Sequence, residues 1–207
     1  MLIVDDVLNL HEEMVSHWHK APVDQSSITG GREGILATIC QQHAYNFQLW
    51  HEEDKARAPQ ASDKEIANVK RTIDGLNQKR NDWIEQIDVA LQDYLETSGV
   101  RLKKMAIKCT ETPGAAIDRL SVMSLRLYHL QEELCRPDVD KAHKEKVRDR
   151  FDVCLQQQAN LAEALELLWK GISAGSIAHR VFRQLKMYND PTLNPAIYSQ
   201  NKPKRAA

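Results

Sequence analysis

The sequence predicts an all-α protein, a single-domain bundle of about five main helices. Apolar residues recur at three- and four-residue steps in five long segments, as they do on the buried face of an amphipathic helix. No segment shows the sustained alternation of apolar and polar residues that a half-buried strand requires. Proline, glycine or short polar stretches separate the five segments, which is typical of turns between helices.

The segments group into an N-terminal helix, two helical hairpins and a C-terminal segment. We expect the following division of the 207 residues: N-terminal helix 1–20, first hairpin 32–98, second hairpin 115–172, and a short helix with an irregular strap 176–207. Pro59 and Pro137 each end a helix because proline lacks a backbone N–H, and Ser62 is a suitable N-cap for the long helix that follows. The short helix is expected near residues 179–187, and the strap YNDPTLNP is expected to lie over a polar centre of the bundle.

Composition narrows the class of protein. A hydrophobic content of 42% with 28% charged residues is that of a soluble folded protein. The net charge of -1 provides no field that would recruit nucleic acid or an anionic membrane. No apolar run approaches the roughly 18 residues of a membrane span, and the acidic N-terminus does not resemble a signal peptide, so we expect a cytoplasmic protein. The four cysteines stand singly without a CxxC pair, which excludes a zinc knuckle or a dithiol redox motif.

The two hairpins carry a similar pattern. In each, an aromatic residue precedes a histidine and an acid follows three residues after that histidine: Trp50-His51 with Asp54, and Tyr128-His129 with Glu132. A proline lies eight residues after each histidine. A duplicated hairpin, or chance similarity between two helical hairpins, would both give this pattern. Duplication would place two hairpins about a pseudo-twofold axis in a four-helix core.

Acidic residues on the first hairpin form a candidate metal site. Residues three and four apart share a helix face, so Glu53 and Asp54 on one helix can face Glu85 and Asp88 on the next. Carboxylate oxygens suit Mg²⁺ or Mn²⁺, and an added imidazole would suit Mn²⁺, Fe²⁺ or Zn²⁺. The alternative is a purely structural network, because a buried charge is costly unless it is paired. In that reading Arg57 and Arg80 neutralise the acids. We would then expect these arginines to form ion pairs with Glu53, Asp74 or Asp82.

Four stretches of the chain resemble a bacterial family known only as a domain of unknown function. They are LWHEEDKAR, KRTIDGLNQKRNDWIEQID, TPGAAIDRLSVMSLRLYHLQEEL and QLKMYNDPTLNPAIY, and the resemblance covers nearly the whole chain. It implies a single all-α domain, often encoded near glycosyltransferases of cell-envelope polysaccharide synthesis. The family's motif positions correspond here to Trp50, His51, Glu53, Asp54, Arg57, Asp74, Asn77, Gln78, Asp82, Asp118, Arg119, His129 and Glu132.

The pattern and the resemblance together predict a metal-assisted enzyme that acts on a phosphorylated small molecule, such as a nucleotide sugar or a nucleotide. In this hypothesis the catalytic acid–base groups are His51, His129 and Glu132, the metal ligands are Glu53, Asp54, Glu85 and Asp88, and the ligand-binding residues are Arg57, Asp74, Asn77, Gln78, Asp82, Asp118 and Arg119. Two other functions are compatible with the sequence. One is a non-catalytic adaptor that forms a homo-oligomer or docks a glycosyltransferase, and the other is a ligand-binding sensor that needs no metal.

Overall fold

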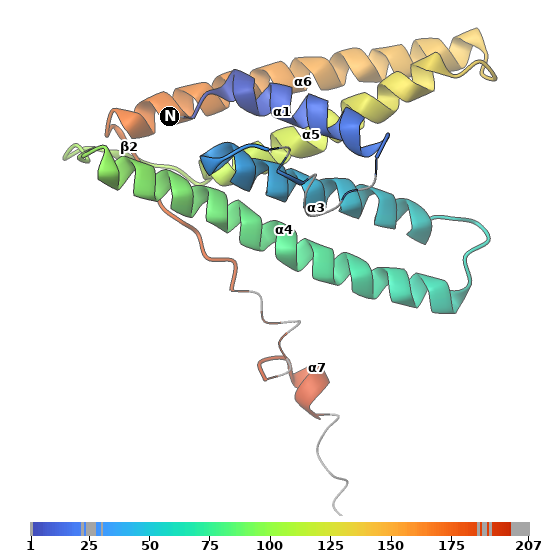
Figure 1. Ribbon diagram of the computed structural model, residues 1–207, viewed down its shortest axis with the longest axis horizontal. Coiled ribbons are helices and arrows are strands. Elements are labelled where there is room, and N and C mark those ends of the chain that lie inside the picture. Colours follow the sequence, from blue (N-terminus) through green and yellow to red (C-terminus); the bar gives the residue numbers. More distant parts are fainter. Residues whose placement is uncertain are drawn as a thin grey trace, which may run out of the picture.

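The computed structural model describes residues 2–21, 23, 28–29, 31–185, 187, 190 and 192–199, and its fold is all-α, as predicted. The long helices are α1 (Val4–Trp18), α3 (Gly34–Ala56), α4 (Asp63–Thr97), α5 (Pro113–Cys135) and α6 (Lys141–Ser173). α3 packs on α4 and α5 packs on α6, so that they form two hairpins that diverge from the end of the molecule near β2 (Figure 1). α1 packs against both α3 and α5.

Side-chain caps set where three of the helices begin. Ser62 and Glu65 form a reciprocal capping box at the start of α4, in which each side chain binds the backbone N–H of the other residue. The Thr112 hydroxyl accepts from the N–H of Ala115 at the start of α5, and Asp140 accepts from the N–H of His143 at the start of α6. Each cap satisfies a donor that has no partner within its own helix.

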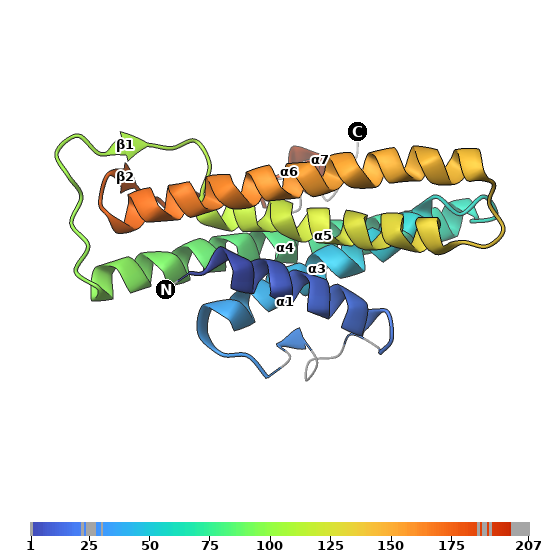
Figure 2. The same ribbon diagram turned by 90° about the horizontal axis from the view of Figure 1, so that it is seen from above.

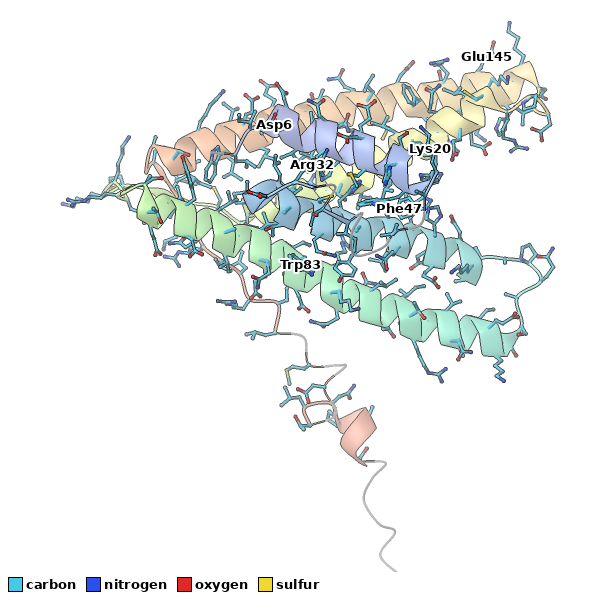
Figure 3. All side chains as sticks on the ribbon, viewed as in Figure 1. Asp6, Lys20, Arg32, Phe47, Trp83 and Glu145 are labelled. Carbon is cyan, nitrogen blue, oxygen red and sulfur yellow. The ribbon has the colours of Figure 1, made fainter. Side chains whose placement is uncertain are left out.

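The main core lies where α1 enters between the two hairpins. Figure 2 shows α1 crossing the bundle on one face, with α5 and α6 side by side along most of their length. The fully buried apolar side chains of this core include Val7 and Leu10 of α1, Ile39 of α3 and Ile117 of α5. Phe47 of α3, labelled in Figure 3, packs its ring on Trp18 and so joins α1 to the first hairpin.

The C-terminal segment differs from the prediction. Residues 179–185 are not helical; they follow a short strand, β2 (Ile177–Ala178), that pairs in parallel with β1 (Ile107–Lys108). A bond from the His179 ring to the Asp88 carbonyl and an ion pair between Arg183 and Glu85 hold the start of this segment along α4. A backbone pairing with β1 and side-chain bonds to α4 thus replace the helix that the periodicity suggested.

The expected strap does not cover the bundle in the part of it that the structure describes. α7 (Pro195–Tyr198) lies apart from the five long helices in Figure 1. Positions 186, 188–189, 191 and 200–207 of the expected strap lie outside the described residues. Among the described residues, no helix is both long enough and apolar enough to cross a membrane.

Candidate metal centre

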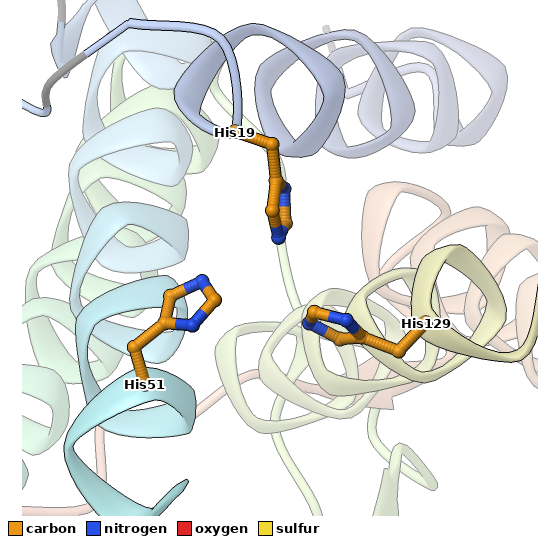
Figure 4. Close-up of side chains that lie close together, drawn as sticks. All are labelled: His19, His51 and His129. Carbon is orange, nitrogen blue, oxygen red and sulfur yellow. The ribbon is translucent and has the colours of Figure 1, made fainter. Parts of the chain in front are cut away.

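Three histidines from three different helices converge at one point of the bundle. His19 caps the C-terminus of α1, His51 belongs to α3 and His129 belongs to α5. One ring nitrogen from each lies within 4.8 Å of the others, and the rings point toward one another (Figure 4). All three side chains are half-buried, so solvent still reaches the group. These three side chains lie close enough together to hold a metal ion after small movements of the rings.

The local sequence positions these rings through their aromatic neighbours. Of the eight histidines, three directly follow an aromatic residue, in the pairs Trp18-His19, Trp50-His51 and Tyr128-His129. The Trp50 ring stacks on His129, with centroids 4.8 Å apart and planes at 11°. The Tyr128 ring stacks on His19, with centroids 4.1 Å apart and planes at 17°. An aromatic ring from one helix therefore fixes the orientation of an imidazole from another.

Hydrogen bonds determine which nitrogen of two rings faces the centre. Nδ1 of His19 lies 2.7 Å from the carbonyl oxygen of Val15, and Nδ1 of His129 lies 2.9 Å from Oε2 of Glu132. Both partners can only accept a hydrogen bond, so in the neutral rings Nδ1 carries the proton and Nε2 carries a lone pair. Both Nε2 atoms are buried and lack a hydrogen-bond partner in the described structure. Two buried lone pairs without a donor are what a bound cation would satisfy.

The electrostatics of the site favour the neutral form of His51. The pKa of His51 is lowered from its ordinary value, first because the ring is partly buried and then because His19 and His129 lie close by. The carboxylates of Asp54 and Glu132 oppose this lowering. A metal binds the unprotonated ring, so a lowered pKa keeps His51 ready to bind a cation at neutral pH.

Three imidazoles with an open side can hold a first-row transition metal. Bonds of about 2.0–2.1 Å to zinc place tetrahedral nitrogen ligands roughly 3.4 Å apart, so side-chain rotations of about an ångström would close the triangle. Metal-bound histidines are commonly oriented by a hydrogen bond from the other ring nitrogen to a carboxylate or a backbone carbonyl. Such partners are already in place at His129 and His19. Three protein ligands leave a fourth position for water or substrate, as in catalytic zinc sites.

The four carboxylates predicted as metal ligands do not meet. Glu53 and Asp54 line a cleft of about 460 Å³ between α3, α4 and α5. Glu85 instead pairs with Arg183, and Asp88 accepts a 2.8 Å bond from the N–H of Gly114 at the start of α5. Burial raises the pKa of the Asp88 carboxyl, and the bonds from Thr112 and Gly114 oppose that change. Helical spacing predicted that Glu85 and Asp88 share one face of α4. Residues from other elements, Arg183 and Gly114, already bind their carboxylates.

The predicted ligand-binding residues fall into separate groups. Arg57 and Asn77 line the same cleft as Glu53. Arg57 forms an ion pair of 3.0 Å with Glu53, one of the pairs that the structural alternative expected. Arg119 pairs with Glu111 at 2.8 Å in a neighbouring cleft. Three others lie on α4 with local partners: Asp74 pairs with Lys70, and Gln78 donates a 2.7 Å bond to Asp82.

Asp118 is buried and belongs to a hydrogen-bonded network of protein side chains. Its Oδ1 accepts from Gln42 at 2.6 Å, from Asn46 at 2.9 Å and from Nε of Arg80 at 2.8 Å. Its Oδ2 accepts from the Nη2 of Arg80. With both oxygens engaged by protein donors, the carboxylate links α3, α4 and α5. Arg80 therefore pairs with Asp118, and not with Asp74 or Asp82 as the structural alternative expected.

The metal hypothesis from the sequence missed His19. His51 and His129 were expected as acid–base groups, and the structure places them beside His19, with Glu132 bound to His129. The signal that could have found His19 is the aromatic–histidine pair, which occurs three times in the chain and marks all three members of the group. Only the fold shows that the end of α1 reaches the two hairpins.

Comparison with known proteins places the chain in a family without assigning it a chemistry. No curated protein and no solved structure matches it. One family model, described as a protein of unknown function (DUF4254), matches residues 36–181 and thus spans α3 to α6 and β2. The resemblance seen in the sequence is confirmed, and the chain belongs to the DUF4254 family.

Proposed function

We propose that this protein is a metal-assisted enzyme whose cation is held by His19, His51 and His129. The observation that carries the proposal is the convergence of three ring nitrogens within 4.8 Å, two of the rings having buried Nε2 atoms without a partner among the described residues. Burying a polar atom without a partner costs free energy, and a cation shared by the rings would remove that cost.

The ligand type favours a different metal from the one the carboxylates suggested. Imidazole nitrogen suits Zn²⁺, Fe²⁺ or Mn²⁺, whereas Mg²⁺ prefers oxygen ligands. We therefore expect Zn²⁺ to bind more tightly than Mg²⁺. A metal in such a site lowers the pKa of a bound water and makes it a nucleophile near neutral pH. The reaction class that fits is metal-assisted hydrolysis of a phosphorylated small molecule, the substrate class expected from the sequence.

The protein residues have distinct roles in this proposal. Glu132 and the Val15 carbonyl fix the tautomers of His129 and His19, so that each presents a lone pair to the cation. Trp50 covers one face of His129 and limits the movement of the ring. Asp54 lies one turn after His51 on α3, and none of the ion pairs among the described residues includes it. That carboxylate is available to accept a proton near the centre.

The test adds metal to chelator-stripped protein and measures binding by isothermal titration calorimetry and by thermal melting. We expect one Zn²⁺ per chain and a higher melting temperature with Zn²⁺, because a ligand that binds only the folded state stabilises it. His51→Ala should abolish the tight site. His17→Ala is the matched control, since His17 is exposed and lies two residues before His19 on the same helix. Equal Zn²⁺ binding by His51→Ala and the parent protein would refute the proposal.

The same titration separates the histidine site from the predicted carboxylate site. Glu53→Gln and Glu85→Gln should leave Zn²⁺ binding unchanged, because these side chains pair with Arg57 and Arg183 and not with the histidines. If either substitution removed metal binding while His51→Ala did not, the carboxylates would be the ligands.

A non-catalytic interaction role is the second candidate. Four apolar side chains of the C-terminal segment are exposed: Phe182, Leu185, Met187 and Leu193. Leu185 is 82% exposed, although a leucine of a folded chain gains by burial. An adaptor that binds a second copy or an enzyme partner would cover this segment. Light scattering of the full chain and of Leu185→Ser distinguishes the two roles, because the adaptor proposal expects a complex that the substitution weakens.

A further inference from the structure

Two adjoining clefts run over α5, and the first is lined by Trp50, whose ring stacks on His129 of the metal centre. The α3–α5 cleft, of about 460 Å³, lies between α3, α4 and α5. The α5–α6 cleft, of about 730 Å³, lies between α4, α5 and α6. Arg80 and Val122 line both, so the clefts meet at those residues. Each has a volume in the range of known small-molecule sites.

Four arginines line these clefts, and three of them have a carboxylate partner within the protein. The pairs are Arg57 with Glu53, Arg80 with Asp118, and Arg119 with Glu111. The fourth arginine, Arg126, forms no ion pair with any carboxylate of the described residues. Its side chain instead contacts two sulfur atoms, that of Met123 at 3.5 Å from Nη1 and the thiol of Cys154. The α5–α6 cleft therefore contains a guanidinium whose charge is not neutralised by the protein.

Arg126 also lies close to the candidate metal centre in the chain. It precedes His129 by three residues on α5, and residues at this spacing are surface neighbours with about 5–6 Å between their Cβ atoms. The opposite wall of the α5–α6 cleft consists of α6 residues without charge: Gln157, Asn160, Leu161 and Ala164. An anionic group at Arg126 would thus have a positive charge on one side and amides and small apolar groups on the other.

We infer that Arg126 binds the phosphate group of the substrate in the α5–α6 cleft, one helical turn from the metal ligand His129. This inference rests on the proposed function, because it places the substrate of the same centre. Guanidinium presents a planar fork of N–H donors that matches two oxygens of a phosphate. The two carboxylates of the cleft wall, Glu111 and Asp118, are already neutralised by Arg119 and Arg80, so they do not repel the anion as free carboxylates would.

The test is calorimetric titration of sodium pyrophosphate into chelator-stripped protein, so that the probe cannot bind through a metal. We expect saturable binding that Arg126→Gln weakens about tenfold or more, as loss of a charged hydrogen bond does. Arg150→Gln is the matched control, because Arg150 is an exposed arginine of α6 outside both clefts. Malonate, a dianion with carboxylates, distinguishes phosphate recognition from general attraction of anions.

The outcomes are separable from those of the metal proposal. Absence of pyrophosphate binding, or equal binding by Arg126→Gln, would overturn the cleft assignment, and malonate binding as tight as pyrophosphate would overturn the phosphate class. Zn²⁺ affinity measured on the same Arg126→Gln sample should equal that of the parent protein, since Arg126 is not a ligand of the three-histidine group. A failed pyrophosphate titration with intact Zn²⁺ binding therefore rejects the cleft alone, and a failed Zn²⁺ titration rejects the metal centre alone.

Discussion

Nδ1 of His129 lies 2.9 Å from Oε2 of Glu132, one turn further along α5. The acid was expected as a catalytic group, and in the proposed metal centre this bond gives it a role through the histidine instead. A carboxylate partner holds the ring in one tautomer and makes the opposite nitrogen a stronger ligand. Glu132 is therefore a positioning residue in the proposed metal centre.

Replacing Glu132 should weaken metal binding without abolishing it. Glu132→Gln keeps a hydrogen-bond acceptor but removes the charge. We expect Zn²⁺ affinity to fall by about 10-fold to 100-fold, as it does when other residues that hydrogen-bond a metal-bound histidine are replaced. Glu132→Ala removes the acceptor as well and should lie at the weaker end of that range. Competition with a chromophoric chelator measures both values.

A matched substitution shows whether the loss depends on position. Glu163 is an exposed glutamate of α6, and Glu163→Gln changes the net charge by the same amount. Its Zn²⁺ affinity should equal that of the parent protein. Equal affinities for Glu132→Gln and Glu163→Gln would show that the bond to His129 does not tune the site.

Buried neutral histidines should make stability depend on pH. Burial lowers the pKa of His43 to about 3, and burial followed by the nearby His43 lowers that of His11 well below its usual value. Between about pH 6.5 and the folded-state pKa, the unfolded chain binds protons that the folded chain does not, so stability falls as the pH falls. For His43 alone, lowering the pH from 7 to 5 should cost about 2 kcal/mol of unfolding free energy. Urea denaturation at the two pH values measures the loss.

Substitution isolates the contribution of that ring. His43→Gln cannot titrate, so the difference in unfolding free energy between pH 7 and 5 should shrink by about 2 kcal/mol, whatever its effect on stability at pH 7. His143→Gln is the control, because the His143 side chain is 42% exposed and pairs with a surface glutamate, Glu133. A pH dependence in His43→Gln equal to that of the parent protein would assign the loss to other groups.

Helical periodicity predicted most of the fold because it is a local property. The outer bounds of the predicted hairpins, 32–98 and 115–172, lie within two residues of the start of α3, the end of α4, the start of α5 and the end of α6. Ser62 is the N-cap that the sequence suggested. The short helix expected near residues 179–187 is wrong because β1 supplies backbone partners to β2 from 70 residues earlier in the chain, in the register Ile107 with Ile177. A pairing across that separation leaves no periodic signal in a two-residue strand.

The site was predicted only in part because spacing along one helix does not show which side chains neighbouring helices already use. Glu85 and Asp88 share a face of α4, yet Arg183 pairs with one and the N–H of Gly114 binds the other. His51 and His129 were identified from the aromatic–histidine pattern in the hairpins. His19 was missed because its place beside them depends on the packing of α1, which the pattern of its own helix does not reveal.

Loss of Arg80 should destabilise the bundle. Asp118 is buried, and without Arg80 its charge keeps only the amide donors of Gln42 and Asn46. Removing one partner of a buried ion pair lowers the unfolding free energy by about 3–5 kcal/mol. We expect Arg80→Ala to lie near the lower value, because Asp118 keeps its amide donors and because Arg80 is partly exposed. Arg119→Ala removes an arginine from an exposed pair and should cost less than about 1 kcal/mol. Equal unfolding free energies for the two variants, measured in urea, would show that the Asp118 network contributes little.

The start of α5 requires a glycine for steric reasons. A Cβ at Gly114 would lie 2.6 Å from the backbone oxygen of Ile84 and 2.9 Å from the Asp88 carboxyl. Because one of these neighbours is backbone, Gly114→Ala should push α5 away from α4 and lower the unfolding free energy by about 1–3 kcal/mol. Gly75→Ala is the matched control within α4, where a Cβ would meet nothing within 4 Å. It should raise stability by up to about 1 kcal/mol, since alanine favours a helix interior more than glycine does. Urea denaturation should therefore give shifts of opposite sign, and a neutral Gly114→Ala would mean that the two helices can separate there without cost.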